Sequence, residues 1–130
     1  MTIQEKIFSL WSSDAGAVVL VPATRFKPSG FYQNLAFPHV IFHRITGDRY
    51  RTIEEGAADT FDREVWQFSI HTSVNAAESS AEAIRRKLIA VFDGNHAGFN
   101  FHYRSVGPTI TSQDQQYLML PVDFLVTSTV

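Results

Sequence analysis

The sequence predicts an α+β fold of two layers, in which a mainly antiparallel four-stranded sheet carries two helices on one face. The expected chain order is helix, strand, strand, helix, strand, strand. Three segments predict it: residues 62–94 combine a half-buried strand with an amphipathic helix, residues 2–12 form another amphipathic helix, and residues 117–127 alternate like a strand. Helices with one apolar stripe and a sheet with one apolar face bury these surfaces against each other, which requires two layers.

The N-terminal helix is expected to begin at Thr2, which forms a capping box with Glu5. Its apolar stripe consists of Ile3, Ile7, Leu10 and Trp11. The next segment, 14–21, is apolar, but it is too short for periodicity to distinguish a helical turn from a buried strand. Pro22 ends this segment.

Residues 23–38 are predicted to be a loop that crosses the domain, because prolines and a glycine punctuate them. The loop carries large apolar side chains at Phe26, Phe31, Tyr32, Leu35 and Phe37. Such a cluster is either packed on the chain's own core or covered by a partner, because clustered apolar groups are uncommon on free surfaces. The own-core interpretation is favoured, and the partner interpretation stays open.

The strand expected over 39–46 has apolar residues on both faces, which indicates a central strand or a face that meets another subunit. His39 and His43 lie in this strand, and His71 lies in the strand expected over 64–71. Their spacing matches none of the usual metal-ligand patterns. We therefore expect these histidines to be surface or interface groups, and we expect no metal and no cofactor.

Residues 47–61 form a long polar connection between two strands that should pair antiparallel. Connections longer than about 12–15 residues without structure of their own are usually functional or disordered. The segment is therefore either an arm that extends the hairpin and orders against a neighbour, or a surface loop. The whole chain, 1–130, has the length of a single domain with a substantial core.

The central strand-and-helix segment alternates apolar and polar side chains over 64–71. Asn75, followed by Glu78, predicts a capping box at the start of the helix, and Gly94 predicts its end. The apolar stripe of the helix comprises Ala77, Ala81, Ile84, Leu88 and Val91. The rest of the fold is interpreted as cover and extension for this pair.

The C-terminal part predicts two further strands. Residues 95–106 alternate around three aromatic side chains, and residues 117–127 place five large apolar side chains on one face. Residues 109–111 are expected to be a short extended piece. Pro121 lacks an N–H group, which predicts that the last strand lies at an edge or is bulged there.

Composition excludes several kinds of chemistry. The chain has no cysteine, so disulfides, thiolate zinc sites and cysteine nucleophiles are excluded. A formal net charge of −2 gives no basis for non-specific binding to nucleic acid, which depends on neutralising phosphates. The N-terminus has no signal-peptide pattern, which favours the compartment of synthesis, the cytoplasm. Eleven phenylalanines predict a core or interfaces built from aromatic rings.

Motifs that carry chemistry are missing from the sequence. It contains no nucleophile elbow, phosphate-binding loop or zinc-protease motif. Arg85, Arg86 and Lys87 form a short basic run, which we interpret as a solvated helix face and not as a phosphate site. Residue types and spacing alone therefore predict an α+β domain without a defined activity.

Four stretches of the chain carry a resemblance to a known family. They are the N-terminal helix over 3–11, the segment 24–45 with an Arg–Phe pair and a proline that launches a strand, the strand and Ala-rich helix over 65–88, and the closing strand over 117–126. Their layout resembles the small tail-completion, or tail-terminator, proteins of long-tailed bacteriophages. The resemblance spans nearly the whole chain.

This resemblance implies a structural virion protein without catalytic activity. Its relatives form rings, commonly hexamers, at the head-proximal end of the tail, where they end polymerisation of the tail tube and meet the head connector protein. DNA passes through such a ring without specific binding. A head-to-tail ring needs two different complementary patches on each subunit.

Candidate residues for these contacts follow from the aromatic loop, the second face of the strand over 39–46 and the polar segment over 47–61. The candidates for the subunit interface are Phe26, Phe31, Tyr32, His43, Arg49, Tyr50 and Arg51. The candidates for the acidic lumen are Glu54, Glu55 and Asp59.

Other interpretations stay open at this stage. The chain is alternatively a stopper or adaptor component of the head-tail connector, or a small non-viral α+β domain that binds a ligand under the aromatic loop. A further alternative is an enzyme that uses His43, His71 or His102. Light scattering separates the ring from these alternatives, because a ring has a defined multiple of the subunit mass.

Overall fold

The computed structural model describes residues 2–30, 35–51, 60–73, 78–111 and 117–128. The helices are α1 (Ile3–Ser12), α2 (Ala15–Leu20), the short 3₁₀ turn η1 (Ala23–Arg25) and α3 (Glu78–Phe92). The strands are β1 (Phe26–Pro28), β2 (His39–Arg51), β3 (Thr60–Ser73), β4 (Gly94–His96), β5 (Phe99–Val106), β6 (Ile110–Thr111) and β7 (Tyr117–Ser128).

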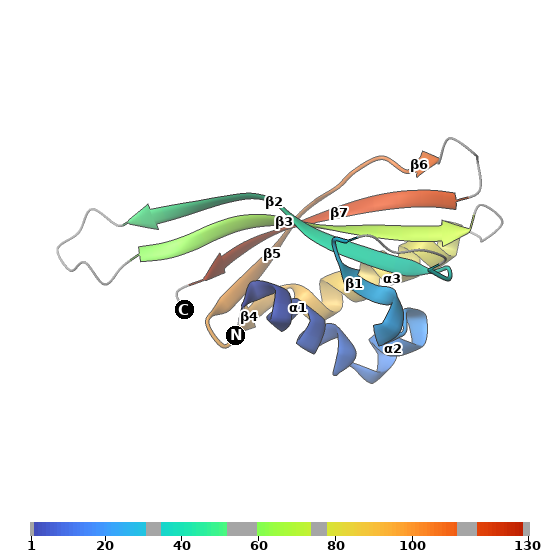
Figure 1. Ribbon diagram of the computed structural model, residues 1–130, viewed down its shortest axis with the longest axis horizontal. Coiled ribbons are helices and arrows are strands. Elements are labelled where there is room, and N and C mark those ends of the chain that lie inside the picture. The colour runs from blue at the N-terminus through green and yellow to red at the C-terminus, as the bar shows by residue number, and fades with distance from the viewer. Residues whose placement is uncertain (1, 31–34, 52–59, 74–77, 112–116, 129–130) are drawn as a thin grey trace.

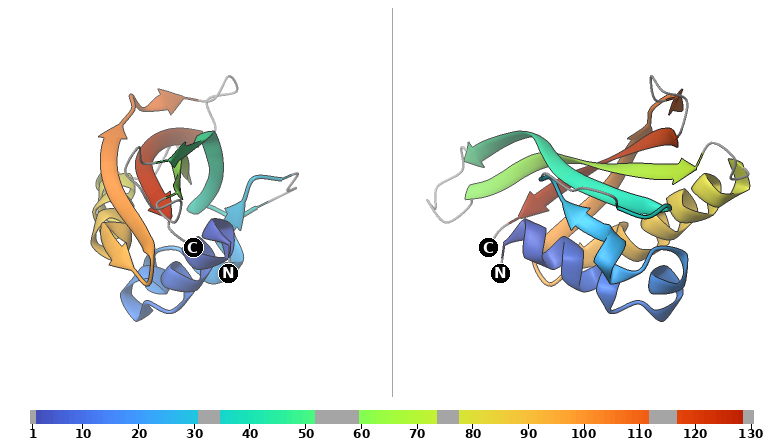
Figure 2. Two further views of the ribbon diagram at one scale, coloured as in Figure 1. Left: turned by 90° about the vertical axis from the view of Figure 1, so that its left-hand side faces the viewer. Right: turned by 45° about the vertical axis from the view of Figure 1, so that its right-hand side comes forward.

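The strands form one mixed sheet in the spatial order β1-β2-β3-β7-β5-β4, and β6 also pairs with β7. The β1–β2 pair is parallel, and the other pairs are antiparallel. Figure 1 shows α1, α2 and α3 on one side of this sheet. Figure 2 shows that the sheet is coiled into a half-barrel, as expected when the right-handed twist accumulates over long strands.

The prediction of a four-stranded, mainly antiparallel sheet with two helices was wrong. The described residues contain seven strands, and three α-helices cover one side of the sheet. The expected loop over 23–38 contains the parallel strand β1, and the expected strand over 95–106 is divided by a turn in which Ala97 and Gly98 have positive φ angles. Strands of three residues carry no detectable periodicity, and only a partner strand elsewhere in the chain defines them.

Local capping explains where the first helices begin. The Thr2 side chain accepts a hydrogen bond from the Glu5 amide at 3.1 Å, as the sequence predicted. The Asp14 side chain accepts one from the Ala17 amide at 2.9 Å. The segment over 14–21, which periodicity left open, is therefore the helix α2. The predicted cap of α3 at Asn75 lies outside the described residues.

The core is built from stacked aromatic rings, in agreement with the high phenylalanine content. Trp11 stacks on Phe26 with ring centroids 4.8 Å apart and planes 5° apart. Phe26 also contacts Phe42 at 5.1 Å, and Phe92 contacts Phe68 at 5.0 Å. All five rings are fully buried. The core therefore joins α1, β1, β2, β3 and the end of α3.

The hairpin of β2 and β3 extends beyond the helices. Paired residues continue from Gly47–Glu64 to Arg51–Thr60, so both ends of the polar segment belong to the hairpin. Figure 1 shows these strand ends projecting from the rest of the sheet. A register shift between Arg44 and Thr46 marks a bulge in β2, and bulges bend the strand that contains them.

The sequence predicted that Pro121 places the last strand at an edge or in a bulge. Both alternatives were wrong, because β7 lies between β3 and β5 and its pairing with β3 runs through Pro121 without a register shift. The Gly107 amide donates a hydrogen bond to the Pro121 carbonyl at 2.9 Å, just beyond the last β5–β7 pair at Val106–Val122. The N atom and the carbonyl of one strand residue point to the same side. Pro121 therefore turns its missing donor toward the gap between β5 and β6, where the ladder is already interrupted.

We expect the substitution Gly107→Ala to lower the free energy of unfolding by about 1–3 kcal/mol, the usual effect of overpacking. A Cβ at Gly107 would lie 2.7 Å from Cγ of Pro121, and a proline ring in a central strand has little freedom to move. Gly16→Ala is the matched control, because its Cβ would meet the end of the flexible Lys87 side chain. Urea denaturation measures both variants, and equal losses would contradict this account.

Candidate functional site

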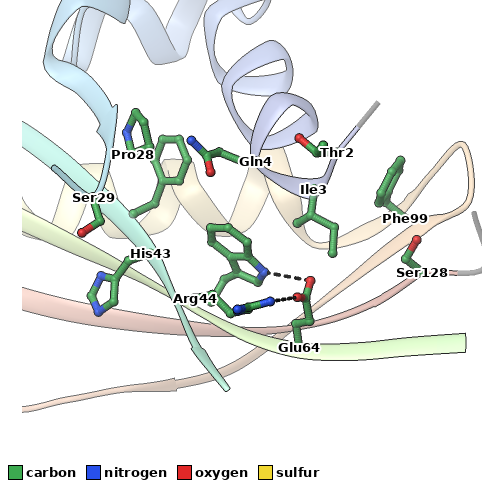
Figure 3. Close-up of a pocket in the computed structure, with 12 residues that line it drawn as sticks. Thr2, Ile3, Gln4, Pro28, Ser29, His43, Arg44, Glu64, Phe99 and Ser128 are labelled. Atoms are coloured by element: carbon green, nitrogen blue, oxygen red, sulfur yellow. Dashed lines mark hydrogen bonds and ion pairs between the residues drawn. The ribbon is translucent and has the colours of Figure 1, made fainter. Parts of the chain in front are cut away.

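A polar groove lies between the start of α1, the end of β1 and the sheet surface of β2 and β3 (Figure 3). Its volume is about 530 Å³. Thr2, Ile3 and Gln4 line one wall, and Arg44 and Glu64 line the opposite wall. A second hollow of about 510 Å³ shares part of this lining and continues along α1 past Phe8. The groove therefore follows the N-terminal helix over the sheet.

On the wall opposite α1, the Glu64 carboxylate lies between two hydrogen-bond donors. Nη1 of Arg44 lies 3.1 Å from Oε1 of Glu64, and Nε1–H of Trp66 donates to Oε2 of Glu64 at 3.4 Å. The Glu64 side chain is 14% exposed, whereas that of Arg44 is 61% exposed. An exposed ion pair of this kind contributes at most about 1 kcal/mol. Both carboxylate oxygens of Glu64 are therefore engaged within the protein.

A separate apolar pocket, with a volume of about 710 Å³, lies at the other end of β5 and β7 from the polar groove. Its apolar lining comprises Ala81, Val106, Pro108, Leu118 and Leu120. Glu82 and Arg85 of α3 line it as well. Nε of Arg85 donates to Oε2 of Glu82 at 2.9 Å, and this contact lowers the pKa of Glu82 to about 2. This pocket is thus mainly apolar, and the Glu82–Arg85 ion pair lies at its border.

The basic run of α3 is paired with acids. Arg85 and Arg86 both contact the Glu82 carboxylate, and Nζ of Lys87 lies 3.2 Å from Oδ1 of Asp14. The Ala17 amide and the Lys87 ammonium lower the pKa of Asp14, so this acid stays charged. The pairing agrees with the interpretation of the run as a solvated face and leaves no cluster of unpaired cations for a phosphate.

Four rings cluster at the end of the sheet where β2 begins. His39 and His71 face each other across β2 and β3, with ring centroids 4.6 Å apart and planes 14° apart. Phe37 stacks on His39 at 5.2 Å, and Tyr117 contacts His71 at 5.6 Å. A hollow of about 250 Å³ adjoins this cluster.

The structure corrects one predicted interface residue. Phe26 is 0% exposed and lies in the centre of the aromatic core, so its ring is not available to a neighbouring subunit. The sequence could not distinguish this residue from its loop neighbours, because burial of Phe26 depends on the β1–β2 pairing. His43 is half-buried and lines the polar groove, and it stays a candidate.

For the other predicted contact residues, the structure describes either the backbone alone or nothing. Arg49, Tyr50 and Arg51 lie on β2, where their backbone pairs with β3. The remaining candidates, Phe31, Tyr32, Glu54, Glu55 and Asp59, lie outside the described residues.

Sequence reasoning missed the groove itself. Glu64 and Trp66 are two residues apart on one strand, which places them on the same face, and Arg44 lies opposite Trp66 on β2. The i, i+2 spacing of an acid and an indole was visible in the sequence. The position of Arg44 depends on the register of the hairpin, which the sequence did not reveal.

No three His, Asp or Glu side chains converge in a way that could hold a metal ion within the described ranges. None of the helices in the described ranges is long and apolar enough to cross a membrane.

The fold defines the chain as an α+β domain with a coiled mixed sheet, helices on one side and concave surfaces at two ends. A chain of a solved structure described as "Virion of native gene transfer agent (GTA) particle" has this fold, with a TM-score of 0.75 and 14% sequence identity. The match covers 97% of this chain and 93% of that one. A second solved structure matches with a TM-score of 0.59 and 18% identity, over 98% and 96% of the two chains.

These similarities show a shared fold over essentially the full length of each chain. No described protein family matches the sequence. No curated protein is similar to it either.

Proposed function

We propose that this chain is a structural protein of a phage-like virion, which forms a ring at the head-proximal end of the tail. In this role it ends polymerisation of the tail tube and joins the tail to the head connector protein. It acts through contacts with copies of itself and with neighbouring proteins, without catalysing a reaction. DNA passes through the ring without specific binding.

The observation that carries the proposal is the full-length structural match to a chain of a gene transfer agent virion, at a TM-score of 0.75. It is supported by the resemblance of four separate stretches of the sequence to tail-terminator proteins.

The surface features suit a head-to-tail ring, which requires two different patches on each subunit. The polar groove adjoins Phe99 at the start of β5, and the apolar pocket adjoins Val106 at its end. The two concave surfaces are therefore at opposite ends of one strand. Exposed apolar side chains lie near both of them, with Phe8 at the groove and Ile110 near the pocket.

Polymerising tail tubes provide the test. The purified protein is added to the tail tube protein of the same particle during assembly, and tube length and end labelling are measured by electron microscopy. We expect label at one end of each tube and shorter tubes as the protein concentration rises. Light scattering should show a ring-sized species, either alone or on the tubes.

A matched pair of variants makes this test specific. Phe8→Asp places a charge in the hollow that continues the groove along α1, and Lys6→Asp reverses a charge elsewhere on the same helix. We expect only the first variant to lose end binding while both keep the native circular dichroism spectrum. A protein that stays monomeric and never labels tube ends, or one that turns over a substrate, would refute the proposal.

A further inference from the structure

The histidine cluster holds a specific piece of the chain against the sheet. The Arg25 guanidinium donates from Nη1 to the Phe37 carbonyl at 3.1 Å. Nδ1 of His39 lies 3.2 Å from the Ala36 carbonyl, and since a carbonyl only accepts, this nitrogen carries the proton. The Phe37 ring then stacks on His39 and contacts Tyr117 at 5.8 Å. Residues 35–38 are thus attached through Arg25, His39 and Tyr117.

The charges around the two imidazoles oppose protonation. His39 lies on β2, His71 on β3, Tyr117 on β7 and Arg25 on η1. Within the described part of the chain, the lining of the adjoining hollow contains no carboxylate. Burial lowers the pKa of His39, the hydrogen bond to the Ala36 carbonyl partly offsets this effect, and the nearby Arg25 lowers the pKa further. Burial and the facing His39 lower the pKa of His71 to about 4.

We propose that the stacked His39–His71 pair makes the attachment of residues 35–38 sensitive to acid. With both imidazoles neutral, the rings stack and Phe37 packs over them. The Nδ1–H of His39 is already used, so a proton from solvent must enter at Nε2 of His39 or on His71. Two imidazolium rings stacked face to face beside Arg25 repel each other, and the pair separates. The separation removes the surface on which Phe37 rests.

The direction of the effect follows from the depressed pKa values in the folded state. The unfolded chain binds a proton on His71 as the pH falls through about 6.5, whereas the folded chain binds it there only as the pH approaches about 4. The pKa of His39 is shifted in the same direction. Stability is therefore full above about pH 6.5 and is lost as the pH falls from there toward 4. The attachment weakens in the same window.

Nuclear Overhauser effects between ring protons test this inference. We expect contacts from the Phe37 ring to the His39 and Tyr117 rings at about pH 7, and we expect these contacts to be lost as the pH approaches about 4. In His71→Gln, which keeps a neutral polar side chain, the same contacts should remain at the lower pH. His102→Gln is the matched control, because His102 is exposed on β5 and should behave like the unchanged protein.

A second measurement keeps the test independent of folding defects. The imidazole ¹³C shifts of the unchanged protein report the titration of each histidine directly. We expect His71 to titrate with a pKa of about 4, well below the ordinary range of a histidine. An ordinary titration midpoint for His71, or the same pH-dependent loss of the Phe37 ring contacts in His71→Gln, would overturn the proposal.

Discussion

Replacing Phe26 by alanine should destabilise the protein by about 3–5 kcal/mol, the usual cost of truncating a buried phenylalanine. The ring is fully buried, stacks on Trp11 at 4.8 Å and contacts Phe42 at 5.1 Å. Its removal leaves a cavity where α1, β1 and β2 meet, and the flat stacked rings around it cannot collapse into the space. Urea denaturation followed by tryptophan fluorescence gives the loss.

Phe8→Ala is the matched control, because Phe8 is 41% exposed on α1. It should cost less than about 1 kcal/mol, as most surface substitutions do. The pair also separates two roles for phenylalanine in this chain. If Phe26 acted at an interface between subunits, its loss would spare the stability of the monomer and weaken assembly, and that outcome would contradict the burial seen here.

Trp11→Phe should lower the free energy of unfolding by about 2–4 kcal/mol, from lost volume and an unsatisfied acceptor together. The indole Nε1–H donates to the Val21 carbonyl at 2.9 Å, and both residues are fully buried. This bond ties α1 to the end of α2, just before the chain enters β1. The variant leaves the carbonyl without its donor in a site that water does not reach.

Trp66→Phe makes the same chemical change at a different place. The Trp66 indole donates at 3.4 Å to Glu64, which lines the polar groove and keeps its contact with Arg44. Water can replace the indole donor there, so only the lost volume remains, and we expect a smaller loss of about 1–2 kcal/mol. Both variants are compared by urea denaturation monitored by circular dichroism. Equal losses would show that access to water does not distinguish the two sites.

The elements that the sequence predicted well are those with a strong local signal. The capping hydrogen bond of Thr2 and the stripe of α1 follow from residues within one or two helical turns. The alternation over 64–71 predicted the centre of β3, and its core face is buried as expected at Trp66, Phe68 and Ile70. Such local patterns predict the structure reliably because they fix which side chains share one face of a helix or strand, whatever the order of the strands in the sheet.

The elements that were missed depend on partners elsewhere in the chain. β1 has three residues and exists because it pairs with Val40–Phe42. That pairing buries Phe26, which the sequence offered as an interface residue. The same reason applies to the groove, since Arg44 reaches Glu64 only through the register of the β2–β3 hairpin.

The amino-acid sequence by itself determined the aromatic character of the core, the positions of the long helices and strands, and the exclusion of cysteine chemistry. It also pointed to a virion protein through the layout of four segments. Only the tertiary structure decided the number of strands, the parallel pairing of the edge strand β1, the coiling of the sheet and the pairing of His39 with His71. The physical reason is that periodicity and capping are set by neighbours in the chain, whereas strand order, register and burial are set by contacts between residues far apart in it.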